Sequence, residues 1–142
     1  MGIYHSTRRG LVCGAVVSLA AALSSCASPP AGTAQTSLTI TIKADGSKVS
    51  AQHTLECSGD QALEASTLPS ADQACAALNQ QPAIVTPSLD PAAACTEIYG
   101  GPQRAEVSGL LAGEPIQSEF SRSNGCLISQ WEQAELLLDS GL

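Results

Sequence analysis

Hydrophobic and polar residues alternate strictly over residues 37–43, SLTITIK. One face carries a leucine and two isoleucines and the other carries threonine and lysine, which is typical of a strand with one buried face. The Asp45-Gly46 pair that follows is a hairpin-turn signal, and residues 49–57 alternate again. We therefore expect residues 37–43 and 49–57 to pair as an antiparallel hairpin.

A helical period follows this hairpin. Residues 70–80, SADQACAALNQ, place their apolar side chains on one helical face, and Ser70 stands at the expected N-cap position. In this phase Cys75 points inward. Residues 81–94 contain three prolines, which predicts an irregular approach to Cys95.

The second half of the chain predicts another hairpin. Residues 112–115, AGEP, carry turn residues. Strand-like segments stand on both sides of this turn, and we expect a break in the first of them between Val107 and Leu111.

The C-terminal part predicts a short helix and one closing element. Residues 123–133 have a helical pattern that sets Cys126 against the sheet, and residues 134–138 are a strand or a helix end. The inward residues of that end are expected to be Ala134, Leu136 and Leu138. Together the elements predict an α+β fold, a five-stranded antiparallel sheet with two helices.

Composition narrows the function classes. The chain has 13 Asp and Glu against 6 Lys and Arg, and 3% of its 142 residues are aromatic. It has no basic stripe or aromatic cluster, so nucleic-acid binding is disfavoured. A small core made mostly of aliphatic side chains buries little apolar surface, so disulfides become more important for the stability of the domain. No motif pairs a nucleophile with a base, so we expect neither an enzyme nor a cofactor.

The first 25 residues have the layout of a bacterial lipoprotein signal peptide. Arg8 and Arg9 precede a mostly apolar run, residues 11–23, which is too short to span a bilayer comfortably. The LSSC sequence ending at Cys26 resembles a lipobox, whose cysteine thiol accepts a diacylglycerol. We expect an exported lipoprotein on the outer face of the cell membrane. The alternative is an ordinary secretory signal and an extracellular protein.

Beyond Cys26, the sequence predicts a tethered, acidic domain. Residues 26–36 are small, polar and proline-bearing, as in a flexible tether, and residues 37–142 would form the domain. All thirteen acids but only four bases lie beyond Cys26, a formal charge of −9. Anionic lipid repels such a domain, so we expect the membrane contact to be made through the lipid anchor.

Four cysteines remain once the leader and Cys26 are set aside. An even number in a small exported domain predicts two disulfides, with three possible pairings. Sequential pairing closes the shortest loops and is favoured, each bridge contributing about 3–4 kcal/mol in the chain-entropy model. The paired residues would be Cys57 with Cys75 and Cys95 with Cys126. Zinc is disfavoured, because no CxxC pair is present and His53 is the one histidine after the leader.

Residues 94–103, ACTEIYGGPQ, combine features that conflict in a regular element. Ile98 and Tyr99 favour an extended backbone, yet two glycines and a proline follow them and indicate a loop. The stretch therefore predicts an extended loop that is pinned by Cys95 and carries Glu97 near its tip.

Several stretches between residues 37 and 138 together resemble the Streptomyces-type subtilisin inhibitor family. LEC ends the second strand, and TLPSADQACAAL resembles the family's Thr-His-Pro followed by a helix with Ala-Cys and leucine. CTEIY resembles its Cys-Pro-x-x-Tyr reactive loop. EVSGLLAGEPIQSEFSRSNGC resembles its closing hairpin, which ends in Phe, Asn and Cys. The order and spacing of these stretches make the resemblance specific.

The resemblance implies a five-stranded sheet with two helices, the sequential disulfides, and often a homodimer built on the sheet. It also implies inhibition of serine proteases. Carried over residue by residue, it puts Glu97 on the acyl side of the scissile bond and Ile98 on the amine side. The flanking contacts would be Cys95, Thr96 and Tyr99.

The loop also departs from the family pattern. Thr96 replaces a proline, and Gly100 and Gly101 replace an Asp-Pro pair, so we expect a looser backbone there. An acid at Glu97 suits neither apolar nor trypsin-type pockets, which suggests a glutamate-specific serine protease as the partner. The alternative interpretation is a cell-envelope binding or structural lipoprotein that keeps the fold without inhibiting.

Overall fold

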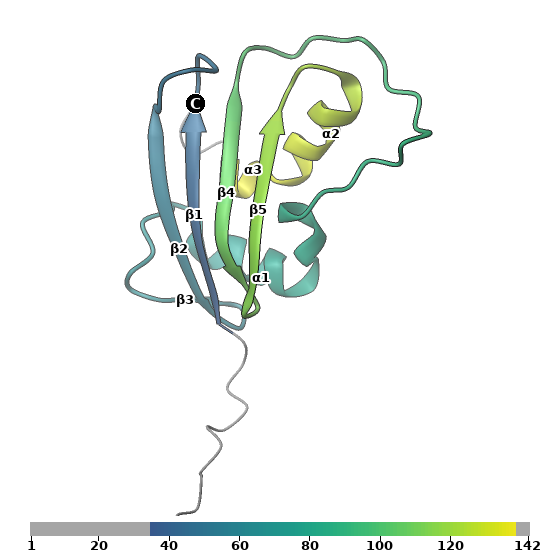
Figure 1. Cartoon of the computed structure of the whole chain (residues 1–142). Coiled ribbons are helices and arrows are strands. Elements are labelled where there is room, and N and C mark those ends of the chain that lie inside the picture. The colour runs from purple at the N-terminus through teal and green to yellow at the C-terminus, as the bar shows by residue number, and fades with distance from the viewer. Residues whose placement is uncertain (1–34, 139–142) are drawn as a thin grey trace, which may run out of the picture.

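The computed structural model describes residues 35–138, which form an antiparallel sheet with helices on one face (Figure 1). The expected signal peptide and the lipidation site at Cys26 lie outside the described residues. The strands are β1 (Thr36–Lys43), β2 (Ala51–Ser58), β3 (Gln61–Ala62), β4 (Arg104–Leu111) and β5 (Glu114–Ser121). The helices are α1 (Ala71–Gln80), the 3-10 helix η1 (Pro82–Val85), α2 (Gly125–Gln133) and α3 (Glu135–Leu138). The predicted α+β class and five-stranded sheet are confirmed.

The strand order in the sheet is β3-β2-β1-β4-β5, with every neighbouring pair antiparallel. The first predicted hairpin is β1 with β2, and Leu38 lies opposite Leu55. β1 begins at Thr36, one residue inside the expected tether, while Val49 lies outside the strands and is 58% exposed. Because β1 is central, its alternating pattern fixes which face of the whole sheet is buried.

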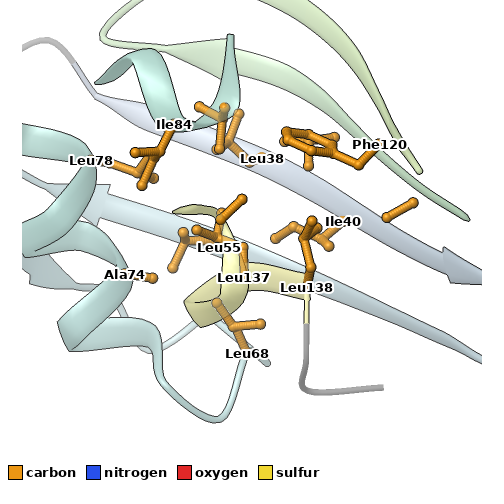
Figure 2. Packing of buried hydrophobic residues seen from close by; sticks show 14 of the residues in the cluster. Leu38, Ile40, Leu55, Leu68, Ala74, Leu78, Ile84, Phe120, Leu137 and Leu138 are labelled. Carbon is orange, nitrogen blue, oxygen red and sulfur yellow. The ribbon is translucent and has the colours of Figure 1, made fainter. Parts of the chain in front are cut away.

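The core lies between the sheet and the helices. Strand residues from β1, β2 and β5 meet Leu137 and Leu138 of α3 in one cluster (Figure 2). Phe120 and Trp131 are the largest buried side chains, so two aromatics supplement the aliphatic core that the composition predicts. The other face of the sheet is polar, as at Thr39 and Thr41 of β1.

α1 is stapled to the sheet as the helical phase predicts. Cys75 is fully buried and bonded to Cys57 of β2, which confirms the first disulfide pairing. Ser70 stands at the N-cap position, but its side chain does not cap the helix. Its hydroxyl instead donates a 2.6 Å hydrogen bond to the carbonyl oxygen of Leu136. This bond links the start of α1 to α3.

Three details of the expected layout are wrong. β4 runs unbroken through Gly109, because a missing side chain there lets the Ser37 carbonyl of β1 come close. The fifth strand is β3, between the first hairpin and α1, where the sequence pattern predicts no strand. Glu135–Leu138 form the helix α3, one of the two expected alternatives, but the expected inward position of Leu136 is wrong, because helical phase buries Leu137 and leaves Leu136 38% exposed.

No helix within residues 35–138 is long and apolar enough to cross a membrane.

Candidate reactive loop

A long irregular segment leaves η1, passes outside α2 and returns to the start of β4 (Figure 1). Its last part, residues 94–103, is hereafter called the loop. Residues 96–99 are exposed to solvent, with Ile98 at 62% and Tyr99 at 66%. Two large apolar side chains so exposed contribute nothing to the core, so folding alone does not explain them.

The tip of the loop has an unpaired backbone. Within residues 35–138, Glu97, Ile98 and Tyr99 neither donate nor accept a hydrogen bond. Their amides and carbonyls are therefore available to a strand of another protein, as a substrate backbone is when it enters a protease cleft.

The N-terminal limb of the loop is fixed to the first turn of α2. Cys95 is disulfide-bonded to Cys126 with their Cα atoms 5.3 Å apart, which confirms the second pairing. The Gly125 amide donates a 2.9 Å hydrogen bond to the Thr96 carbonyl oxygen. A Cβ at Gly125 would collide with Oγ1 of Thr96, so the glycine makes room for this limb.

The turn ahead of α2 is itself ordered. The Asn124 side chain caps the helix by accepting a 3.0 Å hydrogen bond from the Leu127 amide. An N-cap of this kind is worth about 1 kcal/mol and holds the first helical turn in place. The limb at Thr96 is therefore bound to a part of α2 that is already fixed.

The C-terminal limb of the loop begins at Gly100 and is held by Arg122 and Ile128, which flank the start of α2 as the partners of the first limb do. The Gly100 amide donates a 2.7 Å hydrogen bond to the Arg122 carbonyl oxygen. A Cβ at Gly100 would lie 2.9 Å from both Cδ1 and Cγ1 of Ile128. The expectation that Gly100 loosens the loop is wrong, because its missing side chain allows close packing against α2.

The next two residues are constrained as well. Gly101 has a φ of +130°, a value that an L-residue adopts only with strain and that proline cannot reach. The Pro102 carbonyl packs against Gly46 of the β1–β2 turn so closely that a Cβ at Gly46 would collide with it. The hairpin turn therefore supports the loop at Pro102.

Asp45 orders that supporting turn. Its Oδ1 accepts backbone hydrogen bonds from Lys48 at 2.8 Å and from Ser47 at 2.9 Å. These bonds favour the charged carboxylate, led by the one from Lys48, and hold the pKa of Asp45 below its usual value.

An open groove of 570 Å³ lies beside the loop's N-terminal limb. It is lined by Pro87 and Leu89 on the limb's approach, by Thr96, and by Ser129 of α2. The approach to Cys95 therefore stands away from α2, and firm attachment begins at the disulfide.

Other polar groups do not extend the site. His53 lies in mid-strand opposite Ile40, with its buried Nε2 unpaired in the described chain. Residues 35–138 hold no cluster of histidine, cysteine and acidic side chains suited to a metal ion. The structure thus brings Cys95, Thr96, Glu97, Ile98 and Tyr99 together in the loop and leaves His53 apart.

Comparison with known proteins finds a likeness among solved structures and none elsewhere. No family model and no curated protein matches the chain. Among solved structures, the chain is similar to sermetstatin of Streptomyces caespitosus, crystallised in complex with subtilisin of Bacillus licheniformis. The match has 23% sequence identity and a TM-score of 0.45, and it covers 75% of this chain and 94% of that chain.

Proposed function

We propose that the domain inhibits serine endopeptidases by presenting the loop as a substrate, with the bond between Glu97 and Ile98 as the scissile bond. The observation that supports this most directly is the contrast within the loop. The tip at residues 97–99 is exposed and unpaired, while both limbs are fixed to residues 122–128.

This contrast suits an inhibitor better than an ordinary substrate. When the protease serine attacks the Glu97 carbonyl, the acyl fragment stays joined to α2 through the Cys95 disulfide and the Thr96 hydrogen bond. The new amine of Ile98 is held by the adjoining limb at Gly100. Because the amine cannot diffuse away, religation competes with hydrolysis. A preordered loop also avoids much of the entropy cost of binding.

The Glu97 side chain would determine which class of protease accepts the loop. A carboxylate buried without a partner in an apolar pocket costs several kcal/mol, so subtilisin-type pockets would accept it poorly. A pocket that supplies a cation would accept it well. The proposed partner is therefore an exported glutamate-specific serine endopeptidase.

The position of the loop also fits a membrane-tethered inhibitor. Thr36 begins β1 at one end of the sheet, and Lys43 ends β1 opposite Arg104, which follows the loop (Figure 1). A strand of this length spans about 25 Å. A domain anchored through Cys26 would therefore carry its loop at the end away from the membrane.

The test is a panel of glutamate-specific, trypsin-type and subtilisin-type serine endopeptidases, incubated with the soluble domain, residues 35–142. We expect tight inhibition of a glutamate-specific member and slow cleavage between Glu97 and Ile98, seen by mass spectrometry. Glu97→Leu should shift inhibition toward subtilisin by about 2 kcal/mol, or about thirtyfold. Glu64→Leu, at another exposed acid, is the matched control and should change nothing.

If neither the parent nor Glu97→Leu inhibits any member of the panel, the proposal is wrong. The cell-envelope binding lipoprotein would then be the better interpretation. Cleavage at a bond other than Glu97–Ile98, with inhibition retained, would reassign the reactive site.

A further inference from the structure

The bases within residues 35–138 are gathered at one end of the sheet. Beyond Cys26 the sequence has four, and all lie beside the loop. Lys43 ends β1, Arg104 begins β4 directly opposite it, and Arg122 follows β5 and binds Gly100 through its carbonyl. Lys48 lies in the β1–β2 turn that supports the loop. We call these four residues the basic collar.

The acids are distributed differently. Four of them lie at the opposite end of the sheet, where the described chain begins, namely Glu56, Asp60, Asp72 and Glu114. Four others share the loop end, namely Asp45, Glu97, Glu106 and Glu119. The loop end is thus nearly balanced in charge, whereas the rest of the domain is strongly negative.

The collar has no evident role in folding. Within residues 35–138 none of its four cations forms an ion pair. Lys43 and Arg104 face each other across paired strands, an arrangement of like charges that destabilises a sheet. Lys48 and Arg104 are exposed. Unpaired charges at a rim are available to a partner and act mainly on the rate of association.

We propose that the collar steers the loop onto a protease whose active-site cleft is rimmed by carboxylates. This inference rests on the proposed inhibitory function and adds the charge of the partner's surface. A strongly negative domain is repelled by an acidic partner from most directions, and the loop end is the approach where that repulsion is lowest. Glu97 meets a cationic pocket at the centre while the collar meets anionic groups around it.

The position of the collar argues against a lipid surface as its partner. The described chain begins at Gln35, beside the acidic end, and the collar lies at the other end of β1. A domain anchored through its N-terminal segment would carry the collar away from the membrane.

The test compares two variants of equal net charge. The collar variant combines Lys43→Gln, Lys48→Gln and Arg104→Gln, and spares Arg122 because its carbonyl holds Gly100. The control combines Gln61→Glu, Gln73→Glu and Gln80→Glu, three exposed positions on β3 and α1. Association and dissociation rates are measured with the protease of the panel above that the parent inhibits most tightly, from about 20 mM to about 500 mM NaCl.

We expect the collar variant to associate about tenfold more slowly than the control at low salt. The two should converge at high salt, with dissociation rates close to the parent's. Equal association rates for the two variants would overturn the collar proposal and leave the inhibitory function standing. Inhibition of no protease in the panel would overturn both.

A second measurement separates the lipid alternative. Parent, collar variant and control are sedimented with phosphatidylglycerol vesicles. We expect none of the three to bind. Binding by the parent and control that the collar variant loses would assign the collar to an anionic membrane and overturn the proposal.

Discussion

The Gly100 amide donates a 2.7 Å hydrogen bond to the Arg122 carbonyl oxygen at a point where no side chain fits. A Cβ there would lie 2.9 Å from the end of Ile128 and 3.2 Å from Cβ of Arg122. The bond joins the chain just after the proposed scissile bond to the chain just before α2. Gly100 therefore holds the fragment whose retention would separate an inhibitor from a substrate.

Gly100→Ala should weaken this attachment. Overpacking of this kind costs about 1–3 kcal/mol, and the loop would yield because the helix is better fixed. We expect a comparable loss of inhibition and faster net cleavage of the Glu97–Ile98 bond. Ile128→Ala removes the obstructing atoms, so Gly100→Ala/Ile128→Ala should lose less than the sum of the single variants. Strict additivity would show that the contact does not position the loop.

Gly125→Ala tests the other limb in the same way. Its Cβ would overlap Oγ1 of Thr96, whereas the Thr96 Cβ, at 3.4 Å, leaves ordinary room. We expect about a tenfold weaker inhibition constant, and recovery of most of it in Gly125→Ala/Thr96→Ala. A double variant as weak as Gly125→Ala would instead point to a disturbed helix N-terminus, which circular dichroism of α2 peptides and of the domain would reveal.

The two disulfides should differ in what their loss does. Each closes a loop, of 18 residues for Cys57–Cys75 and 31 residues for Cys95–Cys126, and removal of either should cost about 2–5 kcal/mol of unfolding free energy. Cys95→Ser/Cys126→Ser should also turn the domain into a rapidly cleaved substrate, because the acyl fragment is then held by little more than one hydrogen bond. Cys57→Ser/Cys75→Ser, assayed below its melting temperature, should inhibit as the parent does.

Sequence patterns anticipated the elements that bury one face continuously. Strict alternation located β1 and β2, and helical phase placed Cys75 inward. The patterns failed where the conformation at one residue depends on a contact with a residue distant in sequence. Gly109 resembles a strand break in isolation, yet β4 continues because the Ser37 carbonyl occupies the space of a side chain. The α3 segment is too short to show its period.

The loop, too, could be predicted from the sequence only in part. Its position, its cysteine and its exposed tip follow from the sequence, because Ile98 and Tyr99 favour an extended backbone and the two glycines and the proline after them indicate a loop. Its supports do not, since Gly100 and Gly125 carry no side chain that signals a contact. Only the packing of Ile128 and Thr96 against them shows that these glycines fix the loop.

Asp45 should make the support of the loop dependent on pH. Its folded-state pKa is lowered, chiefly by the Lys48 amide. Its contribution to stability is therefore full above the ordinary carboxyl pKa of 3.8 and is lost as the pH falls through the lower, folded-state pKa. We expect Asp45→Ala to melt below the parent at neutral pH, with the difference closing as the pH falls below the folded-state pKa of Asp45. A difference that is constant across this range would exclude the charged carboxylate as its cause.

Cys26→Ala tests the anchor and the direction of the loop together. A diacylated cysteine supplies enough buried methylene groups for stable anchoring, while a domain of charge −9 gains nothing from anionic lipid. We expect the parent to fractionate with membranes when the full chain is expressed in a bacterium, and Cys26→Ala to be released or to accumulate unprocessed. Equal fractionation of the two would contradict the lipid anchor.

Because Thr36 and the loop lie at opposite ends of the sheet, the anchored parent should inhibit an added soluble protease about as well as the free domain does. If inhibition appears only after the domain is released from the membrane, the loop does not point outward.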